Sequence, residues 1–454
     1  MRPVLYKNAR LLDPTSGLDE RGAVLTQGQR ILDSGPKLFI DTTTADVDVV
    51  DCGGRCLAPG LVDMRVQVRE PGEEHMETLT SVQQAAAAGG VTTIATLPNT
   101  NPIIDDASLL EFVERRAIEV GLVNLHPYAA ATKGLRGEQM TEMGLLAESG
   151  AVGFTDGEKA IVDSLVMRRI LSYSSRLGKP IIQHPEDPTL AREGCANEGE
   201  IATRLGLSGI PSCAEVMMIE RDLRLVRLTG GRYHAAHVST AEAIQAIAKA
   251  KSDGLKVTCD TAPHYFALDE QAILDYRTFA RVSPPLRSDA DRRAVIRGLA
   301  DGTIDAIASD HAPQDQDSKR VPFAQAMPGV TGLECLLQIS LELAHREEMP
   351  LLDVISRLTH RPAEILGLDY GRIAKGCWAD MVIFDLDIGT KIDAAKWHTK
   401  SKNSAFDGRP VQGRVWRTIH KGQMVYNADA ESREDMFGAR FAAVTAASLE
   451  AHAL

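Results

Sequence analysis

Short apolar segments alternate with longer segments of helical period through most of this chain. Eight apolar segments follow one another, and each ends in polar letters: LVDMRV near residue 61, VTTIATLP near 91, VNLHPYAA near 123, AVGFTD near 151, PIIQHPED near 180, YHAAHV near 233, KVTCDTAP near 256 and DAIASDHAP near 305. Segments with helical spacing, such as SLLEFVERRAIEV and AEAIQAIAKAKSDG, separate them. Eight strands that alternate with helices predict an α/β protein built on a (β/α)8 TIM-like barrel.

The two ends of the chain have a different pattern. Residues 4–50 contain short alternating segments broken by Gly, Pro and Asp, which predicts a small antiparallel β unit. After two helical segments, GRIAKGCWADMVIFDLD and VWRTIHKGQMVYN are again typical of strands. We therefore divide the chain into 1–56 and 369–427 as β segments, 57–368 as the barrel, and 428–454 as a helix-prone tail.

The composition of the chain excludes some kinds of partner and indicates its compartment. The net charge of −12 argues against nucleic acid or an anionic membrane as a partner, because both require a basic face. The seven cysteines are scattered without a CxxC pair, which is typical of a reducing compartment. The N-terminus lacks a signal-peptide pattern, and no apolar run approaches the roughly 20 residues of a membrane span. We expect a cytoplasmic protein.

In a barrel of this type the C-terminal ends of the strands form the active-site face. The polar residues at these ends should therefore converge on one mouth. They are Asn99, Asp156, His184, His237, His264 and Asp310.

The stretch LAPGLVDMRVQVRE, residues 57–70, carries a family resemblance. Residues two apart on a strand point the same way, so Arg65 and Gln67 should project together. The stretch resembles the first barrel strand of the dihydroorotases, a branch of the cyclic amidohydrolases, whose pattern PGLIDxHxHxRE supplies two metal-binding histidines. In this chain Arg65 and Gln67 stand in their places.

The resemblance extends over nearly the whole chain. It includes ETLTSVQQAAAAGGVTTIATLPNTNP, PIIQHPED, AAHVST, PPLRSDADRRAVIRGLADGTIDAIASDHAP and VPFAQAMPGVTGLE. Near the C-terminus, G-x-I-x-x-G-x-x-A-D-x-V-x-F-D resembles the segment that packs with the N-terminal strands in amidohydrolases. The resemblance thus implies an amidohydrolase barrel with one small β domain built from both chain ends.

The resemblance also implies a metal site that has lost ligands. The family's ligand positions on strands five, six and eight hold His184, His237 and Asp310, the last of which also has the family's catalytic role. At strand four the family reads FTDDG, whereas FTDGE leaves Gly157 at the bridging position and Asp156 one place early. Because adjacent strand residues face opposite ways, Asp156 is a poor substitute.

Three surviving ligands are enough for one zinc ion. However, a charged Arg65 at about 4 Å would repel each unit of positive charge by about 4 kcal/mol. We expect no cofactor, with zinc as the ion if the site works. We also expect the Arg65 guanidinium to replace the lost cation by pairing with Asp310, and to reach Asp156 as well.

The implied substrate pocket is altered too. Arg69 and Asn99 keep the positions that bind the substrate carboxylate in the family, and His264 would form part of the wall. Ser283 and Gln314 replace an asparagine and a histidine, each at a cost of about 1 to 3 kcal/mol per unpaired group.

Several of these residues also have a purely structural interpretation. His126 and His234 fit ordinary packing positions, and His184 and His237 fit relics held by hydrogen bonds. Arg69 and Glu70 would form a structural pair in that interpretation. Gly89 and Gly90 would allow close packing of helix against strand.

Two functions stay open at this point. The favoured one is a noncatalytic, homo-oligomeric protein of pyrimidine biosynthesis, similar to the dihydroorotase-like chains that have lost metal ligands and support assembly of the aspartate carbamoyltransferase catalytic chain. The alternative is a working cyclic amidohydrolase, either a residual one-metal dihydroorotase that hydrolyses dihydroorotate to N-carbamoyl-aspartate or an enzyme that has diverged to another cyclic amide.

Overall fold

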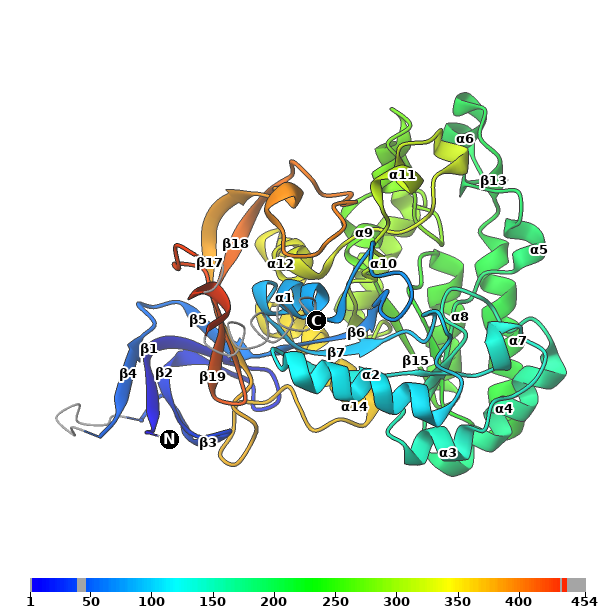
Figure 1. The fold of residues 1–454 in the computed structure, drawn as a ribbon. Helices are drawn as coiled ribbons and strands as arrows, with labels where there is room; N and C mark the ends of the chain where they lie inside the picture. The colour runs from blue at the N-terminus through cyan, green and yellow to red at the C-terminus, as the bar shows by residue number, and fades with distance from the viewer. Residues whose placement is uncertain (1, 39–45, 433–434, 439–454) are drawn as a thin grey trace, which may run out of the picture.

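A computed structural model describes residues 2–38, 46–432 and 435–438 (Figure 1). The predicted barrel strands are all present: β6 (Leu61–Val66), β7 (Val91–Thr96), β8 (Asn124–Pro127), β10 (Phe154–Thr155), β11 (Ile181–Gln183), β14 (Tyr233–Ala235), β15 (Val257–Thr261) and β16 (Ala306–Ile307). They pair in parallel, and β9 (Ala129–Ala130) continues the third strand to meet β10. A bridge from Val66 to His311 joins the first strand to the end of the eighth. The (β/α)8 barrel is thus confirmed.

Helices surround the barrel strands. They are α1 (Leu79–Ala88), α2 (Ala107–Val120), α3 (Met143–Glu148), α4 (Ser164–Leu177), α7 (Cys213–Thr229), α8 (Ala241–Ser252), α10 (Asp289–Asp301), α12 (Leu336–His345), α13 (Leu351–Leu358) and α14 (His360–Leu366). Shorter elements lie in the loops: α5 (Pro188–Ala191), β12 (Ala196–Asn197), α6 (Glu200–Leu205), β13 (Gly209–Ile210), α9 (Pro263–Ala267) and α11 (Gln316–Lys319). Particular residues determine where α4 begins and ends. At its start the Asp163 carboxylate accepts hydrogen bonds from two backbone N–H groups, and at its end Gly178 adopts the left-handed conformation that terminates the helix.

Both chain ends form one β domain, which Figure 1 shows beside the barrel. Its strands are β1 (Val4–Asp13), β2 (Leu18–Gln27), β3 (Arg30–Gly35), β4 (Asp48–Asp51), β5 (Cys56–Pro59), β17 (Met381–Lys391), β18 (Pro410–His420) and β19 (Gln423–Asn427). The sheet order is β19-β18-β17-β5-β1-β2-β3, with β4 on β1. Because β5 lies between β17 and β1, it joins the two ends of the chain directly ahead of the first barrel strand.

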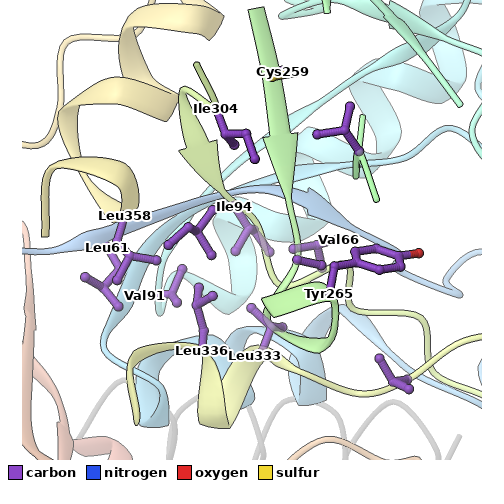
Figure 2. Close-up of a cluster of buried hydrophobic side chains, with 14 of the residues drawn as sticks. Leu61, Val66, Val91, Ile94, Cys259, Tyr265, Ile304, Leu333, Leu336 and Leu358 are labelled. Carbon is purple, nitrogen blue, oxygen red and sulfur yellow. The ribbon is translucent and has the colours of Figure 1, made fainter. Parts of the chain in front are cut away.

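A continuous apolar core fills the space between strands and helices. Figure 2 shows Leu61 of β6 and Val91 of β7 close to Leu336 of α12, with Ile94 of β7 and Val66 of β6 in the same fully buried cluster. Gly89 and Gly90 allow this packing, as predicted. A Cβ atom on Gly89 would lie 2.2 Å from the Leu333 carbonyl oxygen, and one on Gly90 would lie 2.7 Å from Val382 of β17.

Little of the predicted helical tail is described. Residues 435–438 are helical, and Phe437 packs on Tyr426 and His398 with ring centroids 5.8 and 4.9 Å apart. Residues 433–434 and 439–454 lie outside the described residues, so the prediction for them stays a prediction. None of the described helices is long and apolar enough to cross a membrane.

Candidate functional site

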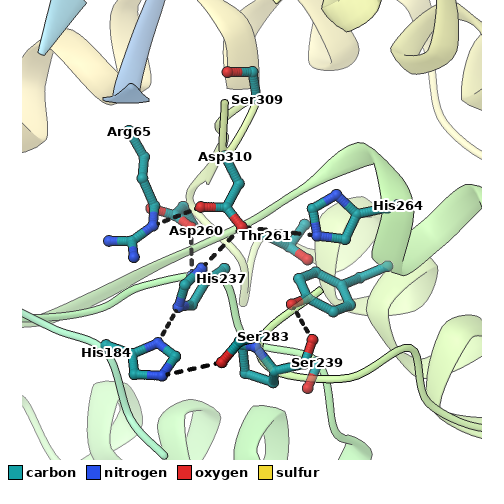
Figure 3. A network of polar contacts seen from close by, with 12 residues as sticks. Arg65, His184, His237, Ser239, Asp260, Thr261, His264, Ser283, Ser309 and Asp310 are labelled. Carbon is teal, nitrogen blue, oxygen red and sulfur yellow. Dashed lines mark hydrogen bonds and ion pairs between the residues drawn. The ribbon is translucent and has the colours of Figure 1, made fainter. Parts of the chain in front are cut away.

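Polar side chains from four strand ends meet at the barrel mouth (Figure 3). Arg65 comes from β6, His184 follows β11, His237 follows β14, and Asp310 follows β16. The backbone at His237 and Asp310 has φ of 39° and 50°, a conformation that L-residues rarely adopt and that costs of order 1 to 3 kcal/mol. At these turns the two side chains meet, with His237 Nδ1 3.2 Å from Asp310 Oδ2.

The Arg65 side chain belongs to this group and is 2% exposed. Its Nε donates to Asp310 Oδ1 at 2.8 Å, so the predicted pair is present (Figure 3). Its Nη2 donates to the Gly157 carbonyl oxygen at 3.3 Å, and its Nη1 is buried without a hydrogen-bond partner. The further contact with Asp156 was predicted wrongly, because that carboxylate accepts from the backbone and hydroxyl of Thr132.

The charges of this pair stabilise each other. Burial opposes the ionisation of Asp310, but His237 and the adjacent Arg65 charge, with His264, outweigh burial and hold the carboxyl pKa well below its usual range. Burial likewise opposes the charge on Arg65, and Asp310 outweighs it, so the guanidinium pKa is raised. Burial, together with Arg65, lowers the pKa of His237 to about 4. The ring is therefore neutral at pH 7, and the charge that neutralises Asp310 is that of Arg65.

The two surviving histidines bond to each other. His184 Nδ1 lies 2.7 Å from His237 Nε2, and His237 Nδ1 lies 3.2 Å from Asp310 Oδ2. Since ionised Asp310 accepts, His237 Nδ1 carries the proton and its Nε2 accepts from His184 Nδ1. His184 Nε2 then faces the Ser283 hydroxyl at 3.4 Å. This chain of hydrogen bonds uses the ring nitrogens that would otherwise bind a metal.

The other altered ligand position, Gln67, bonds to a predicted substrate residue. Asn99 Nδ2 donates to Gln67 Oε1 at 3.3 Å, and Asn99 Oδ1 is buried without a partner. Gly157 is beside them with φ of 71°, and a Cβ there would lie 3.5 Å from Asn99 Cβ. The fourth strand therefore contributes a backbone carbonyl to the site in place of a carboxylate.

Two of the remaining predicted substrate residues bind the protein's own backbone. Arg69 Nε donates to the Pro313 carbonyl at 3.3 Å, and Gln314 Nε2 donates to the Pro328 carbonyl at 2.9 Å. His264 is different, because both of its ring nitrogens are buried without hydrogen-bond partners, and its Nε2 lies 3.8 Å from Asp310 Oδ2. Burial lowers the His264 pKa to about 4, so it faces the site as a neutral ring.

The structural pair of Arg69 with Glu70, which was the alternative interpretation of these residues, does not form. Arg69 pairs with Glu73 at 3.2 Å, while Glu70 accepts from the Leu79 N–H at 2.7 Å and lies 3.6 Å from Arg116. Leu79 begins α1, and the N-terminus of a helix attracts a carboxylate.

Asp260 was missed from the sequence. Its Oδ1 accepts from the His237 N–H at 2.6 Å, and its Oδ2 lies 2.9 Å from His234 Nε2. It therefore fixes the strained backbone at His237. The signal was available, since Asp260 is a charged residue within an apolar strand, KVTCDTAP. His234 has the packing role predicted for it, and His126 lies away from the mouth with its ring 5.8 Å from Tyr370.

Comparisons with known proteins identify the family. A model of dihydro-orotase-like proteins matches residues 54–243, and an amidohydrolase family model matches residues 281–426. A dihydroorotase of Anaplasma phagocytophilum is 46% identical over 94% of this chain and 96% of its own length. The chain belongs to the dihydroorotase family. A dihydroorotase of Geobacter sp. is 42% identical over 94% of this chain and 99% of its own.

Solved structures support the same fold. L-hydantoinase from Arthrobacter aurescens matches with a TM-score of 0.85 at 25% identity, over 96% of this chain and 98% of its own. Dihydropyrimidinase from Brevibacillus agri matches with a TM-score of 0.79 at 21% identity, over 93% and 95%. Both matches cover the barrel and the β domain together.

The mouth of this dihydroorotase-family chain does not fit zinc. Two nitrogens that bind one tetrahedral zinc at 2.0 to 2.1 Å lie about 3.3 Å apart, whereas the facing nitrogens of His184 and His237 are 2.7 Å apart and share a proton. The Arg65 guanidinium takes up the Asp310 oxygen that a metal would need. Within 2–38, 46–432 and 435–438, no three His, Cys, Asp or Glu side chains are placed to hold a metal ion.

Proposed function

We propose that this dihydroorotase-family chain works without a metal and without hydrolysing dihydroorotate. In this proposal it serves pyrimidine biosynthesis by supporting assembly of the aspartate carbamoyltransferase catalytic chain in the cytoplasm. The single observation that supports it most is the buried Arg65 guanidinium, hydrogen-bonded to Asp310 at 2.8 Å where the family's metal would bind.

The chemical reason is the supply of hydroxide. Zinc lowers the pKa of a bound water from about 15.7 to about 7, and so provides a nucleophile for amide hydrolysis at neutral pH. In this mouth the Asp310 carboxylate is committed to Arg65, and the neutral His237 to Asp310. A carboxylate that is this strongly stabilised in its charged form is a poor base, because its pKa lies far below the operating pH.

The state of the pocket supports an architectural role. Arg69, Gln314 and Ser283 bond to groups of the protein itself, so three of the five predicted substrate residues are already paired. The barrel and the β domain nevertheless keep the full family fold. A complete scaffold in which Arg69, Gln314 and Ser283 are bound within the protein suits a chain that acts through its surface.

The relatives favour a second candidate. Proteins named dihydroorotase are 42 to 46% identical to this chain over more than nine-tenths of its length. A hydrolase acting on dihydroorotate or a similar cyclic amide is therefore the alternative, and it requires that zinc displace Arg65 from Asp310.

Metal content and turnover distinguish the two candidates. The purified chain should contain much less than one zinc per chain and show no dihydroorotate hydrolysis above background, with or without added zinc. A dihydroorotase relative purified in parallel serves as the control. Stoichiometric zinc together with ordinary turnover would replace the first candidate by the second.

Co-expression with the aspartate carbamoyltransferase catalytic chain of the same organism tests the assembly role. We expect the two chains to co-elute on sizing, and the transferase to be more active or more stable in the complex than alone. Separate elution with unchanged transferase activity would refute the assembly role, whatever the metal analysis shows.

A further inference from the structure

Helix α4 has an outer face of unusual composition. Its buried side is Val166, Met167, Ile170, Leu171 and Ser174. Its exposed residues recur every three or four positions along one side, and we call them the α4 face: Leu165, Arg168, Arg169, Ser172, Tyr173 and Arg176. Helix periodicity thus places three arginines, a leucine and a tyrosine together in solvent.

The charge on this helix is of one sign. Among its residues 164–177 are three arginines and no aspartate or glutamate. Arg168, Arg169 and Arg176 form no ion pair with any described residue, and Asp163 at the start of the helix is the acidic group whose pKa Arg169 helps to lower. On α10 the equivalent outer arginines are satisfied locally, since Asp289 pairs with both Arg292 and Arg293. In a chain of net charge −12, α4 is an exception.

Apolar side chains extend the α4 face onto its neighbours. Leu165 is 51% exposed and Tyr173 41%, while Leu145 of α3 is 59% and Met217 of α7 is 55% exposed. Figure 1 shows α3, α4 and α7 on the side of the barrel away from the β domain. Interface centres are enriched in Tyr, Arg and Met and depleted in Lys and Glu. The α4 face has that composition.

A hollow of about 370 Å³ lies beside the face. It is formed between α4 and residues 138–143. Its walls include the apolar or aromatic Met140, Met143 and Tyr173 and the charged Arg169, Glu138 and Glu142. Side chains that carry most of the affinity at an interface fill such hollows and are surrounded by a ring that excludes water. The hollow gives the α4 face room for an inserted side chain.

We propose that the α4 face and this hollow dock an acidic surface of the aspartate carbamoyltransferase catalytic chain. This inference rests on the proposed assembly role and names the surface that performs it. Burying unpaired guanidinium groups is favourable only against carboxylates, so the partner surface must carry Asp or Glu around an apolar centre. Leu165, Tyr173 and the hollow favour a protein over nucleic acid, which would meet a chain of net negative charge.

The test compares charge reversal on two helices of the intact chain. Arg168→Glu with Arg176→Glu alters the α4 face, and Arg293→Glu with Arg297→Glu makes the same charge change on α10. We expect the α4 variant to bind the transferase chain 10- to 100-fold more weakly than wild type, and the α10 variant within about threefold. Wild-type affinity should fall between about 50 and 300 mM salt, and the α4 variant should lose most of that salt dependence.

Tyr173→Ala separates apolar docking from charge. It should weaken binding about tenfold while the salt dependence stays as in wild type. Circular dichroism spectra that match wild type establish that each variant is folded. All three α4 residues are exposed and lie outside the barrel mouth, so metal content should be the same in every variant.

Each outcome has a definite meaning. Equal weakening by the α4 and α10 variants, or none by either, overturns the assignment of the α4 face and leaves the assembly role standing. Failure of wild type to bind the transferase chain removes the assembly role, and this inference with it. If the chain alone is an oligomer that the α4 variant converts to monomers, a second copy occupies the face and the proposed occupant is wrong.

Discussion

Replacing Arg65 by methionine is the most informative perturbation of this protein. Methionine fills much of the same space but leaves Asp310 without its cation in a buried site. Removing one partner of a buried pair costs about 3 to 5 kcal/mol. We expect a loss of about 3 kcal/mol at pH 7, because the Asp310 side chain is 12% exposed and gains some hydration.

The loss cannot exceed the free energy needed to protonate Asp310, because a neutral carboxyl no longer needs a cation beside it. Adding a proton at pH 7 to a carboxyl of ordinary pKa, about 3.9, costs about 4 kcal/mol, and the same step at pH 5 costs about 1.5 kcal/mol. In the Arg65→Met chain the folded-state pKa of Asp310 rises above its unfolded value. The stability of this variant is therefore greatest at low pH and falls as pH rises through that new pKa. The variant should be closer to wild type at pH 5 than at pH 7.

A double-mutant cycle with Asp310→Asn isolates the pair. Each single change leaves a buried polar group unpaired, whereas the double change removes both charges, so most of the loss should be recovered. We expect a coupling energy of at least about 2 kcal/mol, measured by urea unfolding followed by circular dichroism. Arg227 and Asp253, an exposed pair, give the matched control, with coupling below about 1 kcal/mol. A coupling energy between Arg65 and Asp310 that is no larger than the one between Arg227 and Asp253 would refute the idea that Arg65 replaces a metal cation.

Three further predictions concern other positions. Arg65→His with Gln67→His should restore little zinc binding or dihydroorotate turnover, because the bridging position on strand four remains glycine; turnover near that of active relatives would assign the bridge to the preceding aspartate. Burial, with Arg281 nearby, lowers the pKa of Lys319 to about 7. The folded state therefore loses this proton at a lower pH than the unfolded state does, and stability should rise with pH from about 7 toward 10.5. The urea midpoint should accordingly be higher at pH 9 than at pH 7 in wild type but not in Lys319→Met. Gly422→Ala should cost about 1 to 3 kcal/mol more than Gly230→Ala in the same assay: both have φ near 70°, but only at Gly422 would the Cβ meet a backbone oxygen, at 1.8 Å in the β2–β3 turn.

The fold was largely predictable from the sequence because its pattern is strong. Eight apolar segments at barrel spacing, each ending in polar letters, correspond to β6 through β16. The pairing of Arg65 with Asp310 was predictable for a related reason. Strand period aims Arg65 into the barrel, and parallel strands bring their C-terminal ends to one mouth.

Contacts outside the regular strands could not be predicted in this way. Glu70 lies beyond the end of β6, where the period of two no longer applies, and its carboxylate turns to the start of α1. Asp156 meets Thr132, and Gln314 meets Asn403 through its backbone N–H at 3.1 Å. Each of these partners comes from a different loop, and no local pattern indicates which loops will touch.

The arrangement at the mouth accounts for how this barrel would stay folded without a metal, as proposed above. Asp310 stands on a left-handed turn that only surrounding contacts can stabilise, and its charge would be costly if left alone. A guanidinium is always charged and reaches two groups at once, here the Asp310 carboxylate and the Gly157 carbonyl. One arginine on the first strand therefore ties the fourth and eighth strands together, a link that a lysine, with its compact charge, would make less well. If this is the role of Arg65, then Arg65→Lys should recover only part of the stability that Arg65→Met loses.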